Sequence, residues 1–201
     1  MSFMEKFQAQ IEKLLVPLAS KLNSQRHICS IRDAFILTFP LTMAGSLMVL
    51  LNSVFLSPDG FLCKTLGLAK LFPNIAELQA IFSPVLKGST DILAILITFL
   101  IARNVAKHLK TDDLLAGLTA VSVFFIVYPD YVKVDDGNHI VTSFLGPQGL
   151  FVAIIVGILV AELMAALSKS DKLEIKMPEQ VPPAVARTFK LLLPIIITTV
   201  I

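Results

Sequence analysis

Basic residues are distributed along this chain in the pattern of a membrane protein. Four long apolar segments lie near residues 34–56, 90–107, 114–129 and 148–167. Thirteen of the 17 Lys and Arg residues lie before the first segment, at or just beyond the inner end of the second (Arg103, Lys107 and Lys110) and after the fourth, whereas the two other connections share four. Lys and Arg in short loops stay on the cytoplasmic side of a membrane. The distribution therefore predicts a multi-pass membrane protein with a cytoplasmic N-terminus and with loops 57–88 and 130–147 outside.

The composition and the cysteine positions exclude several classes of function. Hydrophobic residues make up 55% of the 201-residue chain and charged residues 16%, whereas soluble domains carry about 25% charge. The net charge of +2 gives no indication of nucleic-acid binding. Cys29 and Cys63 fall on opposite sides of the membrane in this topology and cannot form a disulfide. Because the sequence lacks zinc-ligand spacings, glycine-rich phosphate loops and nucleophile triads, we expect no metal site, no cofactor and no catalytic residue in this chain.

The N-terminal 30 residues predict an amphipathic helix on the cytoplasmic side. Apolar residues recur at three- and four-residue spacing over residues 2–25, from Phe3 to Leu22, and charged residues occupy the other faces. This periodicity is typical of a helix lying in the membrane interface, although a helix packed on another chain would show it too. We assign residues 1–30 to this helix and residues 31–201 to a transmembrane scaffold.

Small residues mark the expected contacts between membrane helices. The first apolar segment, Ala34–Leu56, has no charge and is long enough to span a bilayer, and it carries Gly45 and Ser46. The fourth segment carries Gly157 and Ala161, four positions apart. Small residues allow close approach of helix backbones in membranes. We therefore interpret these four residues as helix-packing positions, between helices of one chain or between two copies of it.

The connections contain several start and stop signals. Loop 57–88 holds short apolar pieces broken by prolines, which are too short to span and are typical of interfacial or half-membrane helices. Asp91 lies at the outer end of the second segment, where it serves either a helix N-terminus or a polar pathway. Thr111–Asp113 is typical of a helix start, and Asp136-Gly137 predicts a small hairpin. The breaker cluster Gly146–Gly149 precedes the fourth segment.

Glu162 is the most informative ionisable residue of the apolar segments. It lies six residues before Ser168, or about 9 Å along a helix. An ionisable group at that depth is a functional candidate, but a Glu that reaches the cytoplasmic interface or bonds a neighbouring helix fits the sequence equally well. The three histidines lie in or near predicted loops, where we expect solvated residues rather than ligands or bases: His27, His108 and His139.

A fifth apolar segment begins at Leu191 and reaches the last residue, Ile201. Its length as a helix is about 16 Å, whereas the hydrocarbon core of a bilayer is about 30 Å thick. We therefore expect an all-α fold with about five transmembrane helices, the last one truncated. The chain is then a fragment of a longer protein or a truncated gene product.

Four stretches of the chain resemble one bacterial family. The most specific is the proline-rich stretch Leu173–Phe189, which precedes the fifth segment. Ile31–Ser46, Asp113–Leu118 and Gly149–Glu162 resemble the entries to the first, third and fourth helices of that family. Together they resemble enzyme IIC, the membrane-embedded sugar component of the phosphoenolpyruvate-dependent phosphotransferase system, in its lactose/cellobiose/diacetylchitobiose group. The resemblance covers this whole chain but only about the first half of a family member.

The resemblance implies a sugar permease in the bacterial inner membrane. Family members are homodimers that carry a β-linked disaccharide inward, while a cytoplasmic IIB protein bearing phosphocysteine phosphorylates it. Their sugar-binding and phosphotransfer residues belong to the later half. The resemblance thus assigns no substrate-binding residue here and implies that this chain alone is inactive. Two rival hypotheses are a non-transporting membrane protein that pairs with an intact permease, and half of a secondary transporter.

Overall fold

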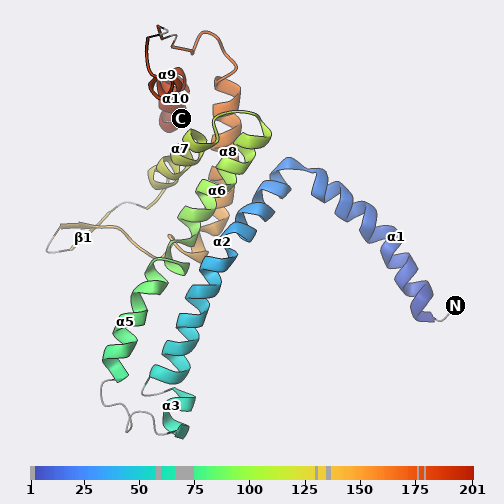
Figure 1. Ribbon diagram of the computed structural model, residues 1–201, viewed down its shortest axis with the longest axis vertical. Helices are drawn as coiled ribbons and strands as arrows, with labels where there is room; N and C mark the ends of the chain where they lie inside the picture. The colour runs from blue at the N-terminus through green and yellow to red at the C-terminus, as the bar shows by residue number, and fades with distance from the viewer. Residues whose placement is uncertain are drawn as a thin grey trace.

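The computed structural model is a bundle of helices with one small hairpin (Figure 1). It describes residues 3–57, 60–66, 75–129, 131–134, 137–175, 177–178 and 180–201. Three helical stretches in this part of the chain are long and apolar enough to cross a membrane: Arg26–Thr65, Gln79–His108 and Pro147–Leu167. A helical fold with helices of membrane-spanning length is thus confirmed, whereas the expected number of five spans is not.

Helix α1, Phe3–Ser24, forms an arm that leaves the bundle at a sharp angle (Figure 1). Gln25 has extended backbone angles, φ −83° and ψ 118°, and separates α1 from α2, Arg26–Leu50. Leu15 and Val16 of the arm are 52% and 62% exposed, because little of the bundle packs against it. The predicted N-terminal helix is therefore present, and its place in the membrane interface stays a prediction.

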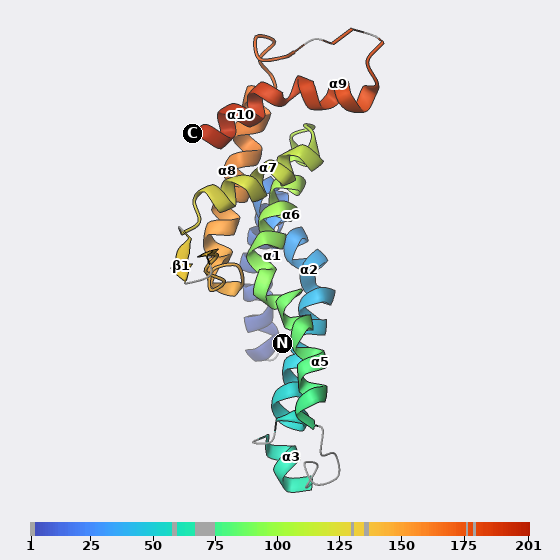
Figure 2. The same cartoon turned by 90° about the vertical axis from the view of Figure 1, so that its left-hand side faces the viewer.

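Helix α2 begins the longest of the three membrane-length helical stretches among the described residues, Arg26–Thr65. It continues as a π-helical segment, η1, Leu51–Leu56, which is followed by α3, Phe61–Leu66. Helix α5, Ile75–Lys87, returns beside α2, and the two helices lie side by side in both views (Figures 1 and 2). Pro40 and Pro84 lie inside these helices without ending them.

The second predicted segment corresponds to α6, Leu93–His108, which begins close to the expected start near residue 90. Helix α5 leads into the 3-10 turn η2, Thr90–Ile92, and then into α6, so that Gln79–His108 forms one apolar helical stretch. The backbone N–H of Gly88 bonds to Pro84 O at 3.2 Å and links the end of α5 to the turn. The sequence did not indicate this link between α5 and α6.

The remaining helices are α7, Asp113–Ile126; α8, Leu150–Leu167; α9, Pro183–Lys190; and α10, Leu192–Val200. Helix α7 begins where predicted, because the Asp112 carboxylate accepts a hydrogen bond from Leu115 N at 3.0 Å and caps the helix. Helix α8 follows the 3-10 turn η3, Pro147–Gly149, as the breaker cluster predicted. With 14 and 9 residues, α7 and α10 are shorter than the length that spans a hydrocarbon core.

The predicted hairpin lies between α7 and α8. Strands β1, Val132–Val134, and β2, Gly137–His139, pair antiparallel, with Val134 opposite Gly137. Gly137 has a φ of 135°, which a residue with a side chain rarely adopts. The hairpin is thus confirmed, while Asp136 of the predicted turn lies outside the described residues.

The core of the bundle surrounds α6, which packs against α2, α7 and α8. Ile97, Ile101 and Val105 of α6 are fully buried, and Ala102 lets a neighbouring helix approach closely. The outer faces are apolar as well, since Phe39 of α2 is 60% exposed. Helices that are apolar both inside and outside the bundle are typical of a protein surrounded by lipid rather than water.

Candidate functional site

Both glycines among the four predicted packing residues, Gly45 and Gly157, lie at contacts between helices of the same chain. A Cβ added at Gly45 would lie 2.5 Å from Ser89 Oγ, where α2 passes the turn between α5 and α6. A Cβ added at Gly157 would lie 3.1 Å from both Ile101 Cβ and Thr98 O, where α8 crosses α6. The absence of a side chain at each position thus allows two helices of the same bundle to touch.

The other two predicted packing residues differ from each other. Ala161 is fully buried, one turn of α8 after Gly157. Ser46 is exposed, and its hydroxyl donates to Thr42 O of its own helix at 2.8 Å. Gly157 and Ala161 are therefore occupied by intrachain packing, and among these four residues only Ser46 is open to a second copy. Formation of a homodimer stays a prediction.

Glu162 joins α8 to the first turn of α2. Its Oε1 atom lies 2.7 Å from Arg26 Nη2 and 2.7 Å from His27 Nε2, and the Glu162 side chain is 32% exposed. The carboxylate is therefore partnered near the end of the bundle, which favours the interpretation as a helix-bonding residue over an isolated intramembrane site. His27, expected to be a solvated loop residue, instead belongs to α2 and contacts a residue 135 positions away.

A second ion pair fixes α9, in the proline-rich stretch, to the bundle. Arg187 of α9 donates two hydrogen bonds to the Asp112 carboxylate, one of them from Nη2 to Oδ1 at 2.7 Å. These hydrogen bonds from Arg187 are the main reason that the pKa of Asp112 is lowered from its ordinary value. Beside this pair, Arg103 Nε lies 3.1 Å from Asp113 Oδ2. The turn between α6 and α7 is thus held by an ion pair with α9 through Asp112 and by one with α6 through Asp113.

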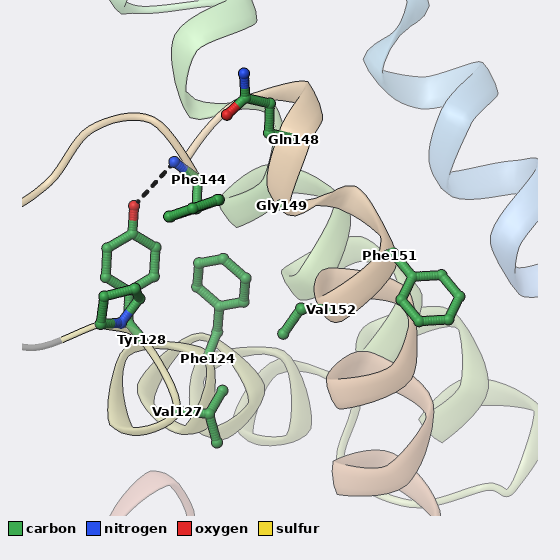
Figure 3. Close-up of a pocket in the computed structure, with 9 residues that line it drawn as sticks. Phe124, Val127, Tyr128, Phe144, Gln148, Gly149, Phe151 and Val152 are labelled. Atoms are coloured by element: carbon green, nitrogen blue, oxygen red, sulfur yellow. Dashed lines mark hydrogen bonds between the residues drawn. The ribbon is translucent and has the colours of Figure 1, made fainter.

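The C-terminal end of α7 and the N-terminal end of α8 enclose an aromatic cavity of about 380 Å³ (Figure 3). The rings of Phe124, Tyr128 and Phe144 face one another in the cavity wall, whereas Phe151 points away from them on α8. The Phe124 ring is 1% exposed, and its centroid lies 5.6 Å from that of Tyr128. The cavity is therefore lined mainly by ring faces and aliphatic side chains, with Gln148 at its edge.

Hydrogen bonds hold the wall of the aromatic cavity in place. The Tyr128 hydroxyl donates to Val141 O and accepts from Phe144 N at 3.2 Å, which is the dashed line in Figure 3. The carbonyl of Leu145 accepts from Ala94 N of α6 at 2.8 Å. The loop before α8 is thus bonded to the end of α7 and to the start of α6, which gives the cavity a fixed shape.

A polar cavity of about 400 Å³ adjoins the aromatic one. Its lining includes the polar residues Asp91, Thr142, Ser143 and Gln148, and Gln148 lines both cavities. Binding pockets for small molecules combine apolar walls with a few convergent polar groups. Carboxylate, amide and hydroxyl groups bond to ligand hydroxyls, and ring faces pack against the flat side of a ligand ring. The pair of cavities therefore suits a compact ligand that carries both hydroxyl groups and an apolar face.

Comparison with known proteins identifies the family. The family described as "Phosphotransferase system, EIIC" matches residues 32–201. The chain belongs to this family. The family inferred from the proline-rich stretch and the helix entries is therefore confirmed, and the integral membrane character follows with it.

Characterised EIIC proteins are similar to the chain over nearly all of its length. The PTS system cellobiose-specific EIIC component of Geobacillus stearothermophilus is 34% identical over 203 residues, which cover 95% of this chain and 43% of that protein. The PTS system oligo-beta-mannoside-specific EIIC component of Bacillus subtilis is 31% identical and covers 94% and 41%. The crystal structure of ChbC, the IIC component of the N,N'-diacetylchitobiose-specific phosphotransferase system, matches with a TM-score of 0.76 and 30% identity, covering 94% and 44%. This EIIC chain thus spans less than half the length of these relatives.

Sequence reasoning did not find the aromatic cavity or the partner of Glu162. Phe124 and Tyr128 are four residues apart at the end of an apolar segment, a spacing that places both rings on one helix face. This spacing could have indicated an aromatic cluster from the sequence alone. The position of Phe144 against the two rings depends on the conformation of the loop before α8, which the spacing does not indicate. The pairing of His27 with Glu162 depends on how α2 and α8 meet, which the sequence does not contain.

Proposed function

We propose that this EIIC chain is the scaffold half of a sugar-specific permease in the bacterial inner membrane. The proposed cargo is a β-linked disaccharide of the cellobiose, chitobiose or lactose type, and its entry is coupled to phosphorylation by a cytoplasmic phosphocysteine IIB protein. The names of the similar EIIC proteins, specific for cellobiose, oligo-β-mannoside and diacetylchitobiose, support this substrate class. We further propose a cytoplasmic N-terminus and a homodimer.

The observation that carries this proposal is the pair of cavities that meet at Gln148. In the proposed orientation they lie at the outer ends of α7 and α8, where an incoming sugar first meets the protein. A pyranose ring has hydroxyl groups around its edge and an apolar face of C–H bonds. The polar cavity with Asp91 suits the edge, and the aromatic cavity with Tyr128 and Phe144 suits the face.

We propose that this chain alone does not phosphorylate sugar. Transfer of a phosphoryl group to a sugar hydroxyl needs a positioned base for the hydroxyl proton. Among the described residues lining the two cavities, Asp91 is the one carboxylate, and no histidine or second carboxylate accompanies it. In this proposal the groups that transfer the phosphoryl group belong to the part of an EIIC protein that this sequence does not include.

A chimaera tests the proposal. The matching segment of the Geobacillus stearothermophilus cellobiose EIIC component is replaced by residues 1–201, and phosphoenolpyruvate-dependent phosphorylation of cellobiose is measured in membranes with the soluble phosphotransfer proteins supplied. We expect phosphorylation by the chimaera and none by residues 1–201 alone. A chimaera that inserts into the membrane but leaves cellobiose unphosphorylated contradicts the permease assignment.

A pair of glutamine variants tests the cavities within the same chimaera. Gln148→Ala removes hydrogen bonds from the shared edge of both cavities, and loss of a bond of this kind weakens binding about two- to tenfold. Gln180→Ala changes the same residue type at an exposed position away from the cavities. We expect the cellobiose concentration at half-maximal rate to rise for the first variant only. Equal values for both variants contradict a role of the cavities in sugar binding.

A further inference from the structure

A cleft of about 530 Å³ lies at the opposite end of the bundle from the aromatic cavity. It is bounded by the turn between α6 and α7, the end of α8 and the joint between α9 and α10, which gather at one end in Figure 2. Its polar lining comprises four basic residues, two acidic residues and two residues with hydroxyl groups: Lys110, Lys169, Arg187, Lys190, Asp112, Asp113, Thr111 and Ser168. Asp113 is paired with Arg103 outside the cleft lining. Leu109 and Leu191 add apolar surface.

The positive charge of the cleft is only partly neutralised. Arg187 is paired with Asp112, and Lys190 Nζ lies 3.0 Å from Glu174 Oε1. Lys110 and Lys169 are exposed, and within the part of the chain that the structure describes neither forms an ion pair. Two ammonium groups therefore remain available at the rim of a cleft whose other charges are balanced.

The backbone at Lys110 is strained. Its φ is 57°, the one positive φ outside glycine among the described residues. This left-handed conformation, common at the end of a helix, is normally taken by glycine or asparagine because a side chain disfavours it. The N–H groups of Leu109 and Thr111 bond back to α6 carbonyls, each at 3.0 Å, and hold the turn in this form. These hydrogen bonds therefore hold Lys110 at a fixed place in the lining of the cleft.

The cleft lies where charged and apolar surfaces of the protein meet. Lys190 ends α9, and the apolar helix α10 begins two residues later with Leu192. Beyond Asp113, the side chains of Leu114 and Leu118 on α7 are 47% and 60% exposed. In the proposed membrane orientation, on which this inference rests, the ammonium groups lie at the level of the lipid headgroups, and the apolar helix surface continues toward the bilayer interior. Basic pockets between membrane helices on the cytoplasmic side bind anionic lipid headgroups.

We propose that this cleft binds the phosphate headgroup of an anionic phospholipid, with Lys110 and Lys169 as its contacts. The ammonium groups donate hydrogen bonds to the phosphate oxygens, and the acyl chains extend along the exposed apolar surface. Because the cleft touches the α6–α7 turn, α8 and α9, a bound lipid joins the proline-rich stretch to the core. This proposal does not depend on the identity of the sugar or on phosphoryl transfer.

The test uses the absence of tryptophan from the chain, whose count of Trp is zero. Leu109→Trp places a single fluorophore at the cleft, and the protein is reconstituted with brominated phosphatidylglycerol or brominated phosphatidylcholine, whose bromine atoms quench a nearby indole. We expect stronger quenching by phosphatidylglycerol. Two lysines near an anionic surface together account for a preference of about thirtyfold, which Lys110→Gln with Lys169→Gln should remove.

The matched control is Lys13→Gln with Lys172→Gln, which removes the same charge from exposed positions outside the cleft. This control should keep the preference. Native mass spectrometry of the chain without the tryptophan, released from mixed-lipid nanodiscs, counts bound phosphatidylglycerol independently of the reporter. Equal quenching by both lipids, or a preference that survives in Lys110→Gln with Lys169→Gln, overturns the proposal. Displacement of the bound lipid by inorganic phosphate at constant ionic strength also overturns the proposal, because it would indicate an ion site. So does a result in which the two lysine substitutions change IIB binding but leave lipid quenching unchanged.

Discussion

Gly149→Ala should destabilise the protein by closing the space between η3 and the preceding loop. A Cβ at Gly149 would overlap with Phe144 O and would lie 3.2 Å from Ala94 Cβ. The backbone of Gly149 has a φ of −87°, which alanine adopts readily, so the effect is a steric one. The loop cannot easily retreat, because Phe144 N is bonded to the Tyr128 hydroxyl.

The magnitude follows from the contacts that must give way. Overpacking of a well-packed site destabilises by about 1–3 kcal/mol, and loss of one hydrogen bond adds about 1 kcal/mol. We therefore expect the free energy of unfolding to fall by about 3 kcal/mol, which lowers Tm by about 6–12 °C for a chain of this size. The measurement is thermal unfolding followed by circular dichroism in detergent micelles.

Gly88→Ala is the matched control for this prediction. A Cβ at Gly88 would have Pro84 O and Val85 O as its nearest neighbours, both at 3.9 Å, which is ordinary contact. We expect its Tm to stay within about 2 °C of the parent protein, since no atom has to move. Equal Tm values for Gly149→Ala and Gly88→Ala would refute the argument that the loop closes tightly over α8.

Three further substitutions test the ion pairs and the helix contact. Glu162→Gln removes a partly exposed ion-pair cluster, so we expect a loss of about 0.5–1 kcal/mol and faster hydrogen exchange at residues 24–28, measured by mass spectrometry; unchanged exchange would contradict the joint between α8 and the first turn of α2. Arg187→Gln should lower Tm at pH 7, and the difference from the parent should disappear as the pH falls below 3.8. The pair with Arg187 lowers the pKa of Asp112 in the folded protein below its value in the unfolded chain. The pair therefore stabilises the fold at pH values above the unfolded pKa, and this stabilisation is lost when Asp112 is protonated at lower pH. A difference in Tm that does not change with pH would exclude the pair. Gly157→Leu should lower stability by about 1–3 kcal/mol through overpacking against α6, measured by thermal unfolding, and a stable variant would place this glycine outside the helix contact.

Local chemistry accounts for the parts of the fold that could be predicted from the sequence. Asp112 caps α7 and the Pro147 cluster starts α8, because both signals act within a few residues of the backbone that they shape. The second apolar segment was located close to α6, Leu93–His108, but the sequence did not show that α5 precedes it in one helical stretch. That continuity depends on the packing of α5 on α2.

The candidate sites could be predicted less completely, since they depend on contacts between distant segments. Glu162 was selected from the sequence as unusual, yet its two interpretations could be separated only by the 2.7 Å contacts with Arg26 and His27. The aromatic cavity requires Phe144, from a loop without regular structure, to lie against Tyr128. A periodic pattern does not encode such a loop position.

Labelling of single cysteines tests the central claim most directly, namely that the chain spans the inner membrane with the hairpin outside and the charged cleft inside. In a background of Cys29→Ser and Cys63→Ser, Asn138→Cys lies on the exposed strand β2, and Lys172→Cys lies in the exposed stretch after α8. An impermeant thiol reagent added to intact spheroplasts is predicted to label Asn138→Cys, and to label Lys172→Cys only after lysis. Labelling of Lys172→Cys in intact spheroplasts, with Asn138→Cys protected, would contradict the orientation and with it the outward position proposed for the two cavities.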